Sequence, residues 1–163
     1  MHKPKSPDSE EEALQSAFRY LSYRARSEAE LLTHLCRKGY SAAACQKALE
    51  KLRTLNYIND ESFARSWVWS RVAGRNYGPR RIEQELRAKG VEQPLIRDVI
   101  GAIFACGDEE KNAKSLLEKR FKGVDLGDPK VLRRASAFLA RRGYSSEVIF
   151  SLMRRRPDDD LEP

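Results

Sequence analysis

Positively charged side chains are the clearest candidates for chemistry in this sequence, and they gather in two segments. Residues 65–97 hold eight cations against three anions, and residues 111–156 hold 13 cations against four anions. Arginine makes charge-assisted, often bidentate, contacts with phosphate and carboxylate groups. The two segments therefore favour an anionic partner, although a solvated surface that only maintains solubility would carry the same excess of charge.

A helix predicted after Pro79 separates its arginines from its apolar residues. At about 100° per residue, Ile82 and Leu86 point to one side of that helix. Arg80 and Arg87 point to nearly the opposite side, with Arg81 at the edge of that face. We therefore predict a basic contact face for a partner or for DNA. Its candidate members are Arg71, Arg75, Arg80, Arg81, Arg87, Lys89, Arg133, Arg134, Arg141 and Arg142.

The residue types that catalysis or metal binding requires are not arranged for either task. The sequence has no Gly-x-x-x-x-Gly-Lys phosphate loop and no His-Glu-x-x-His helix. Its histidines are His2 and His34, and its cysteines are Cys36, Cys45 and Cys106, without a Cys-x-x-Cys pair. Because zinc needs several clustered thiolates or imidazoles, we expect no metal, no cofactor and no enzymatic activity. We interpret the cysteines as small core residues.

The overall composition predicts a basic helical protein of the cytoplasm. The net charge is +7 with a pI near 9.4, and 34% of the residues are charged against 40% hydrophobic. Such a ratio favours a thin architecture with much surface. No window approaches the roughly 18 apolar residues that a membrane span needs, and the polar N-terminus lacks an apolar signal core.

Three glycines reveal the elements that must position the cations. Gly39, Gly90 and Gly143 each end a stretch of helical periodicity, at spacings of 51 and 53 residues. The residues eight and four positions before them are apolar in every case, namely Leu31 and Leu35, Ile82 and Leu86, and Ala135 and Leu139. Similarity at a fixed period indicates a repeat array. A glycine in the left-handed conformation after each helix lets the chain reverse.

The predicted helix starts agree with these glycine turns. Ser27-x-x-Glu30 is a capping box, and Pro79 and Pro129 suit first helical positions. We expect Asp60 and Asp108 to cap the leading helices of the second and third repeats.

Two tryptophans lie on the second leading helix. Trp67 and Trp69 are two positions apart and so point to roughly opposite sides. We expect one of them to pack in the core with Phe63 and the other to contact a neighbouring repeat or to serve as a surface anchor.

These patterns predict an all-α protein of three tandem three-helix repeats that form an elongated, curved array. The expected repeats span residues 10–57, 58–105 and 106–156. A flexible tail of residues 1–9 precedes them, and an acidic tail of residues 157–163 follows.

Three segments resemble motifs of the RecX family, the bacterial regulators of the RecA recombinase. They are residues 21–31 (LSYRARSEAEL) with Lys38-Gly39-Tyr40, residues 57–64 (YINDESFA), and residues 77–82 (YGPRRI) through Lys89-Gly90-Val91. The resemblance covers roughly residues 12–156. Asn59 stands where the family often has a second aspartate, and the third repeat matches through Arg142-Gly143-Tyr144 and its helical pattern.

The resemblance implies a monomeric regulator of recombination, DNA repair and the SOS response. Such proteins lie in the groove of the RecA–DNA filament and inhibit its ATPase and strand-exchange activities, by blocking the groove or by halting filament growth. Single- or double-stranded DNA is a secondary contact. The alternative is a helical-repeat module that binds DNA directly. It predicts strongly salt-dependent binding to DNA without any recombinase.

Overall fold

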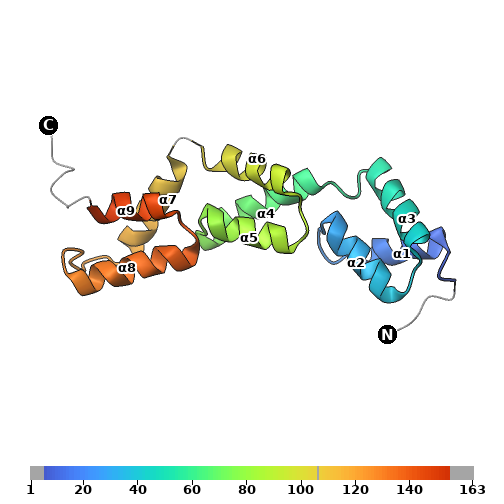
Figure 1. The fold of residues 1–163 in the computed structure, drawn as a ribbon, viewed down its shortest axis with the longest axis horizontal. Coiled ribbons are helices and arrows are strands. Elements are labelled where there is room, and N and C mark those ends of the chain that lie inside the picture. Colours follow the sequence, from blue (N-terminus) through green and yellow to red (C-terminus); the bar gives the residue numbers. More distant parts are fainter. Residues whose placement is uncertain (1–5, 106, 155–163) are drawn as a thin grey trace. The chain divides into compact units, whose positions relative to one another are not determined.

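The structure is a computed structural model that describes residues 6–105 and 107–154. Within these residues it contains nine helices and no strand, so the all-helical prediction is confirmed. Figure 1 shows the helices labelled in chain order. The helices are α1 (Glu10–Leu21), α2 (Glu28–Lys38), α3 (Ala42–Thr54), α4 (Asp60–Arg75), α5 (Pro79–Ala88), α6 (Gln93–Ile103), α7 (Asp108–Arg120), α8 (Pro129–Arg142) and α9 (Ser146–Arg154). None of these helices is long and apolar enough to cross a bilayer.

Several sequence predictions concern positions outside the described residues. These positions are the start of the N-terminal tail, Cys106, Arg155, Arg156 and the acidic segment 157–163. The remaining residues form two compact units. One contains residues up to 66 together with 86–96, and the other contains 67–85 together with the residues from 97 onward.

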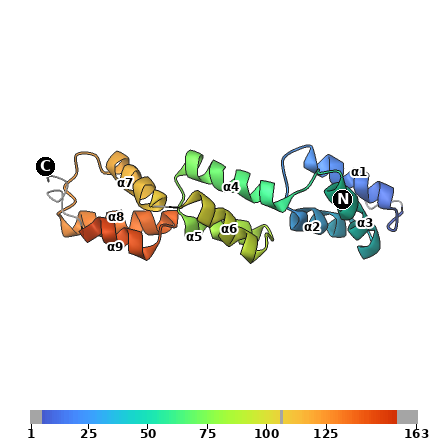
Figure 2. The ribbon, with the colours of Figure 1, turned by 90° about the horizontal axis from the view of Figure 1, so that it is seen from above.

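In the first unit, α1, α2 and α3 pack against one another (Figure 2). They enclose a core of small and medium apolar side chains. Its buried members include Ala13, Ala17, Leu31, Leu35, Ala48, Leu49 and Leu52. Leu32, on α2, and Leu55, just after α3, are exposed. Cys45 is buried in this core, whereas Cys36 is exposed, so the interpretation of Cys36 as a core residue was wrong.

In the second unit, α7, α8 and α9 enclose a separate core. Its buried members are Ala113, Leu116, Leu117, Ala135, Leu139 and Tyr144. Phe121 and Phe138 are partly buried against it.

The three predicted glycine turns are confirmed. The φ angles of Gly39, Gly90 and Gly143 are 99°, 75° and 88°, which L side chains rarely adopt. After each glycine the next amide donates to a carbonyl in the helix just left, through the bonds Tyr40 to Leu35, Val91 to Leu86 and Tyr144 to Leu139. The apolar residues predicted four and eight positions earlier have no exposed surface in any of the three turns.

Most of the predicted helix starts are also confirmed. Ser27 and Glu30 form the capping box at the start of α2. Helix α5 begins at Pro79, and α8 begins at Pro129 behind the cap Asp128.

The two predicted aspartate caps were wrong. The first turn of α4 is capped by Asn59, whose Oδ1 accepts from the Ser62 amide at 2.9 Å. Asp60 instead accepts from the Glu28 amide at 2.9 Å, so it satisfies the first turn of α2. Helix α7 follows Gly107, which makes no side-chain cap.

The two tryptophans differ in exposure. Trp67 is half-buried, with its indole N–H donating to Glu85 at 2.9 Å. Trp69 is 70% exposed, as the surface alternative for the second tryptophan predicts.

Candidate partner-binding surfaces

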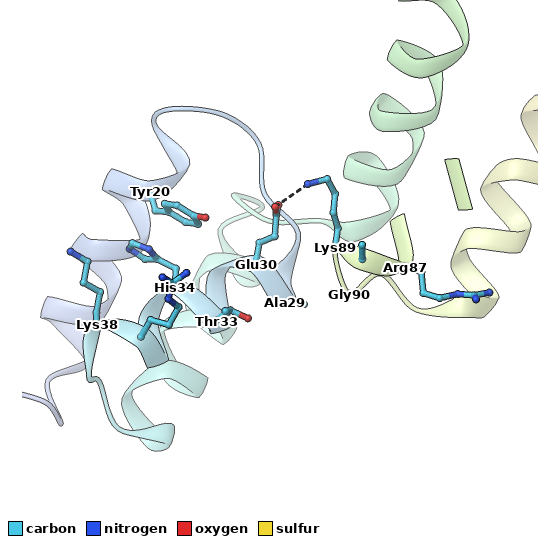
Figure 3. A pocket seen from close by; sticks show the side chains of 11 residues that line it. Tyr20, Ala29, Glu30, Thr33, His34, Lys38, Arg87, Lys89 and Gly90 are labelled. Carbon is cyan, nitrogen blue, oxygen red and sulfur yellow. Dashed lines mark hydrogen bonds and ion pairs between the residues drawn. The ribbon is translucent and has the colours of Figure 1, made fainter. Parts of the chain in front are cut away.

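A joint in the first unit connects the glycine turn after α5 to the start of α2. The Lys89 Nζ lies 3.0 Å from the Glu30 Oε1, a pair drawn dashed in Figure 3. The Ser27 hydroxyl, which caps α2, donates to the Lys89 carbonyl at 2.5 Å. Only 15% of the Lys89 side chain is exposed. Although predicted as a partner contact, Lys89 holds this joint together.

Glu30 is the electrostatic centre of that joint. Burial alone would raise its pKa, but hydrogen bonds from the side chains of Arg24 and Lys89 and from the Ser27 amide stabilise the carboxylate and lower its pKa to about 2. The Arg24 guanidinium reaches both carboxylate oxygens, at 2.8 and 3.1 Å. Glu30 is therefore charged at neutral pH and already neutralised by its own chain.

A second joint, in the other unit, links the start of α5 to the turn after α8. The Gly78 amide donates to the Arg142 carbonyl at 2.8 Å, and the Arg80 amide donates to the Gly143 carbonyl at 3.0 Å. First-turn amides of one helix thus meet last-turn carbonyls of another, which satisfies both ends and aligns their dipoles favourably. The Arg81 guanidinium adds a bond to the Arg141 carbonyl at 3.1 Å.

The same joint uses two more of the predicted contact residues. The Arg80 guanidinium lies 3.2 Å from the Ser146 hydroxyl and 3.6 Å from the Glu147 carboxylate, at the start of α9. Arg80 is exposed, as predicted, but its outward side chain has partners within the unit. The Arg142 guanidinium donates to the carbonyl of Arg75, the last residue of α4.

Arg71 is also engaged. Its Nε lies 2.6 Å from the Glu85 carboxylate, and its guanidinium stacks 3.9 Å from the centre of the Trp67 ring. The predicted basic face therefore separates into cations that hold the chain together and cations that remain at the surface. Among the candidates, Arg75, Arg87, Arg133, Arg134 and Arg141 have exposed side chains that these joints do not use.

Arg87 lines a cleft of about 530 Å³, which we call the first cleft (Figure 3). Its walls come from α1, α2 and the end of α5. They consist of Tyr20, Ala29, Glu30, Thr33, His34, Arg37, Lys38, Arg87, Ala88, Lys89 and Gly90. Four of these residues are cationic and one is acidic, so the first cleft suits an anionic group.

A stack of three side chains supports one wall of the first cleft. The Tyr20 and His34 rings lie parallel with centroids 3.9 Å apart, and the Arg26 guanidinium lies 3.9 Å from the Tyr20 centroid. Burial, reinforced by the charges of Lys38, Arg26 and Arg37, lowers the pKa of His34. His34 is therefore neutral at pH 7, and the positive charge of the cleft comes from arginine and lysine.

A second cleft, of about 320 Å³, lies in the other unit between α7 and α8. It is lined by Arg120, Phe121, Arg133, Arg134, Ala137, Phe138 and Arg141. Arg133, Arg134 and Arg141 were predicted from the sequence. Arg120, Phe121 and Phe138 were not, nor were Arg37 and Lys38 of the first cleft. Charge counting included Arg120, but only packing brings the two phenylalanines beside it.

Family comparisons cover each three-helix domain separately. Residues 13–52 match the RecX first three-helix domain, residues 59–100 the second, and residues 108–153 the third. The chain belongs to the RecX family. The prediction of three three-helix units is thereby confirmed, and so is the resemblance seen in the motifs.

Individual relatives carry the same family name. The "Regulatory protein RecX" of Mycolicibacterium vanbaalenii is 35% identical over 150 residues, covering 88% of this chain and 81% of the relative. That of Mycobacterium leprae is 34% identical over 148 residues, covering 90% and 86%. The crystal structure of RecX from Lactobacillus salivarius has a TM-score of 0.77 at 21% identity, covering 89% of this chain and 94% of that one, and so shares the fold.

Proposed function

We propose that this RecX-family chain binds as a monomer in the groove of a RecA recombinase filament in the cytoplasm and inhibits ATP hydrolysis and strand exchange there without catalysis of its own. The observation that carries the proposal is the match of all three domains to the family, whose curated relatives are named regulatory proteins. A regulator of this kind acts by occupying a surface, and its basic clefts supply one.

The first cleft is the surface that we assign to the recombinase filament. Arg37 and Arg87 stand in it on different elements, and both side chains are exposed. A filament groove presents DNA phosphates and acidic side chains, with which guanidinium groups form charge-assisted contacts. The Lys89–Glu30 joint fixes α2 against the end of α5, so the two arginines are presented from a stable frame.

The test measures RecA ATP hydrolysis on single-stranded DNA at increasing concentrations of this protein. We expect the wild-type chain to inhibit, and Arg37→Gln with Arg87→Gln to need at least about tenfold more protein, because two charge-assisted contacts are lost. Lys47→Gln with Lys51→Gln is the matched control, since it removes the same charge from exposed positions on α3. Equal inhibition by the cleft variant and the control would reject the first cleft as the contact.

Arg80 and Arg87 each bond a side chain of their own unit, and the Arg87 Nε donates to the Gln93 Oε1 at 3.1 Å. Charge reversal at Arg80 would also break its bonds to Ser146 and Glu147, so a loss of inhibition could come from a disturbed joint.

Direct binding to nucleic acid is the second candidate function. The exposed arginines of the second cleft favour it, because they need no recombinase to attract phosphates. Both functions are compatible in one chain.

A further inference from the structure

The second cleft combines two kinds of side chain that are found together where proteins hold single-stranded nucleic acid. Four arginines line it together with Phe121 and Phe138. We propose that this cleft of the third domain is a binding site for single-stranded nucleic acid, with arginines on the phosphates and bases against the phenylalanine rings. The site rests on the direct nucleic-acid binding proposed above and deepens it, because it names an unpaired strand as the ligand and the side chains of the third domain that hold it.

Among the described residues, the arginines of the second cleft differ from Arg71 and Arg80 in having no acidic partner. Within residues 6–105 and 107–154, no carboxylate forms an ion pair with Arg120, Arg133, Arg134 or Arg141. Arg71 and Arg80, by contrast, each face a glutamate. None of the residues that line the second cleft is acidic. Within the described part of the chain, no carboxylate therefore offsets the positive charge of this cleft.

The spacing along α8 suits a polymer more than a small ion. Arg134 and Arg141 are seven residues apart, which is about two helical turns and about 10 Å along the axis. Both therefore lie on one side of α8, and both line the cleft. Two guanidinium groups at this separation can meet different phosphates of one strand.

The aromatic side chains decide between nucleic acid and an acidic protein segment. Phe121 and Phe138 make an edge-to-face pair with centroids 6.0 Å apart, and both are only partly buried. An acidic peptide would satisfy the arginines but would leave this aromatic surface unmatched. Bases stack on aromatic rings without regard to sequence, and they offer their faces only when a strand is unpaired.

The first experiment measures binding of fluorescent oligothymidylate by anisotropy, with no recombinase present. Arg134→Gln with Arg141→Gln should weaken binding at least about tenfold and lower the salt slope by about 1.4, because two phosphate contacts are lost. Lys47→Gln with Lys51→Gln lowers the net charge equally, from exposed positions outside the cleft, and should change the affinity less than twofold. Equal weakening by the two double variants would show an effect of net charge alone and overturn the site.

A second experiment tests the stacking contribution. Phe121→Leu keeps an apolar side chain but removes the ring, and should weaken oligothymidylate binding about tenfold while far-UV circular dichroism stays unchanged. A duplex of the same length should bind more weakly than the single strand. If polyglutamate displaces the oligonucleotide as well as unlabelled oligothymidylate does, or if Phe121→Leu binds like wild type, the site is not one for nucleic acid. Neither result bears on the recombinase contact, because none of these assays contains recombinase.

Discussion

Gly90→Ala is the sharpest test of the joint between α5 and α2. A Cβ atom at Gly90 would collide with the Cβ of Ala29, on the first turn of α2. The φ of Gly90 is also positive, at 75°. The substitution therefore adds a steric penalty to a conformational one, and both can be sized separately.

The conformational penalty for an L residue in the left-handed region is about 1–2 kcal/mol. Overpacking of a close contact costs about 1–3 kcal/mol more. We therefore expect Gly90→Ala to lower the free energy of unfolding by about 2–5 kcal/mol. Gly123 is the matched control, since its φ is 73° and no neighbouring atom of the described residues lies within 4 Å of the place that a Cβ would take. Gly123→Ala should therefore cost only the conformational part.

Removing the opposing atom should relieve the collision. Ala29→Gly alone costs at most about 1 kcal/mol in helix propensity. In the double variant Ala29→Gly with Gly90→Ala, the steric part disappears, which predicts a favourable coupling energy of about 1–3 kcal/mol. Urea unfolding followed by far-UV circular dichroism gives the free energy of unfolding of the wild type, the two single variants and the double variant. Additive effects, or equal losses for Gly90→Ala and Gly123→Ala, would refute the close contact.

Three further predictions follow from the same geometry. Because the pKa of Glu30 is about 2 against an ordinary 4.5, its contribution to stability is present above pH 4.5 and is lost as the pH falls toward 2. Glu30→Gln should therefore lower the free energy of unfolding at pH 7 and make it depend less on pH between 4.5 and 2, as measured by urea unfolding at several pH values. Gly78→Ala should lower the melting temperature, since its Cβ would lie 2.5 Å from a carbonyl oxygen in the turn after α8. Gly74→Ala should raise it slightly, because Gly74 lies inside α4 and no described atom comes within 4 Å of the added Cβ. In a Cys106→Ala background, maleimide should label exposed Cys36 well before Cys45, because burial and the neighbouring thiol raise the pKa of Cys45 to about 11. Comparable labelling rates under native conditions would contradict the packing of α3.

Local rules were enough to predict the helices and their turns. A glycine that follows a helical stripe needs only its own φ and the residues just before it, so Gly39, Gly90 and Gly143 could be assigned from spacing alone. The burial of Ile82 and Leu86 followed from periodicity in the same way.

Contacts between distant elements could not be predicted, because they depend on which helix ends meet. Periodicity correctly placed Arg80 on the outward face of its helix, but it could not show that the start of α9 would lie beside this side chain. Asp60 looked like the cap of its own helix, yet its neighbour Asn59 takes that role and Asp60 reaches α2. Likewise, Phe121 and Phe138 look like ordinary core residues until α7 and α8 bring them into the second cleft.

The most direct test of the proposed function is a pull-down of RecA by this protein under conditions that do and do not assemble the filament. We predict strong retention of RecA when single-stranded DNA and a non-hydrolysable ATP analogue are both present, and weak retention when either is omitted. The Arg37→Gln with Arg87→Gln variant should lose this retention, while the Lys47→Gln with Lys51→Gln control keeps it. Absence of RecA from the pull-down under filament conditions, with the protein folded and in excess, would contradict the account.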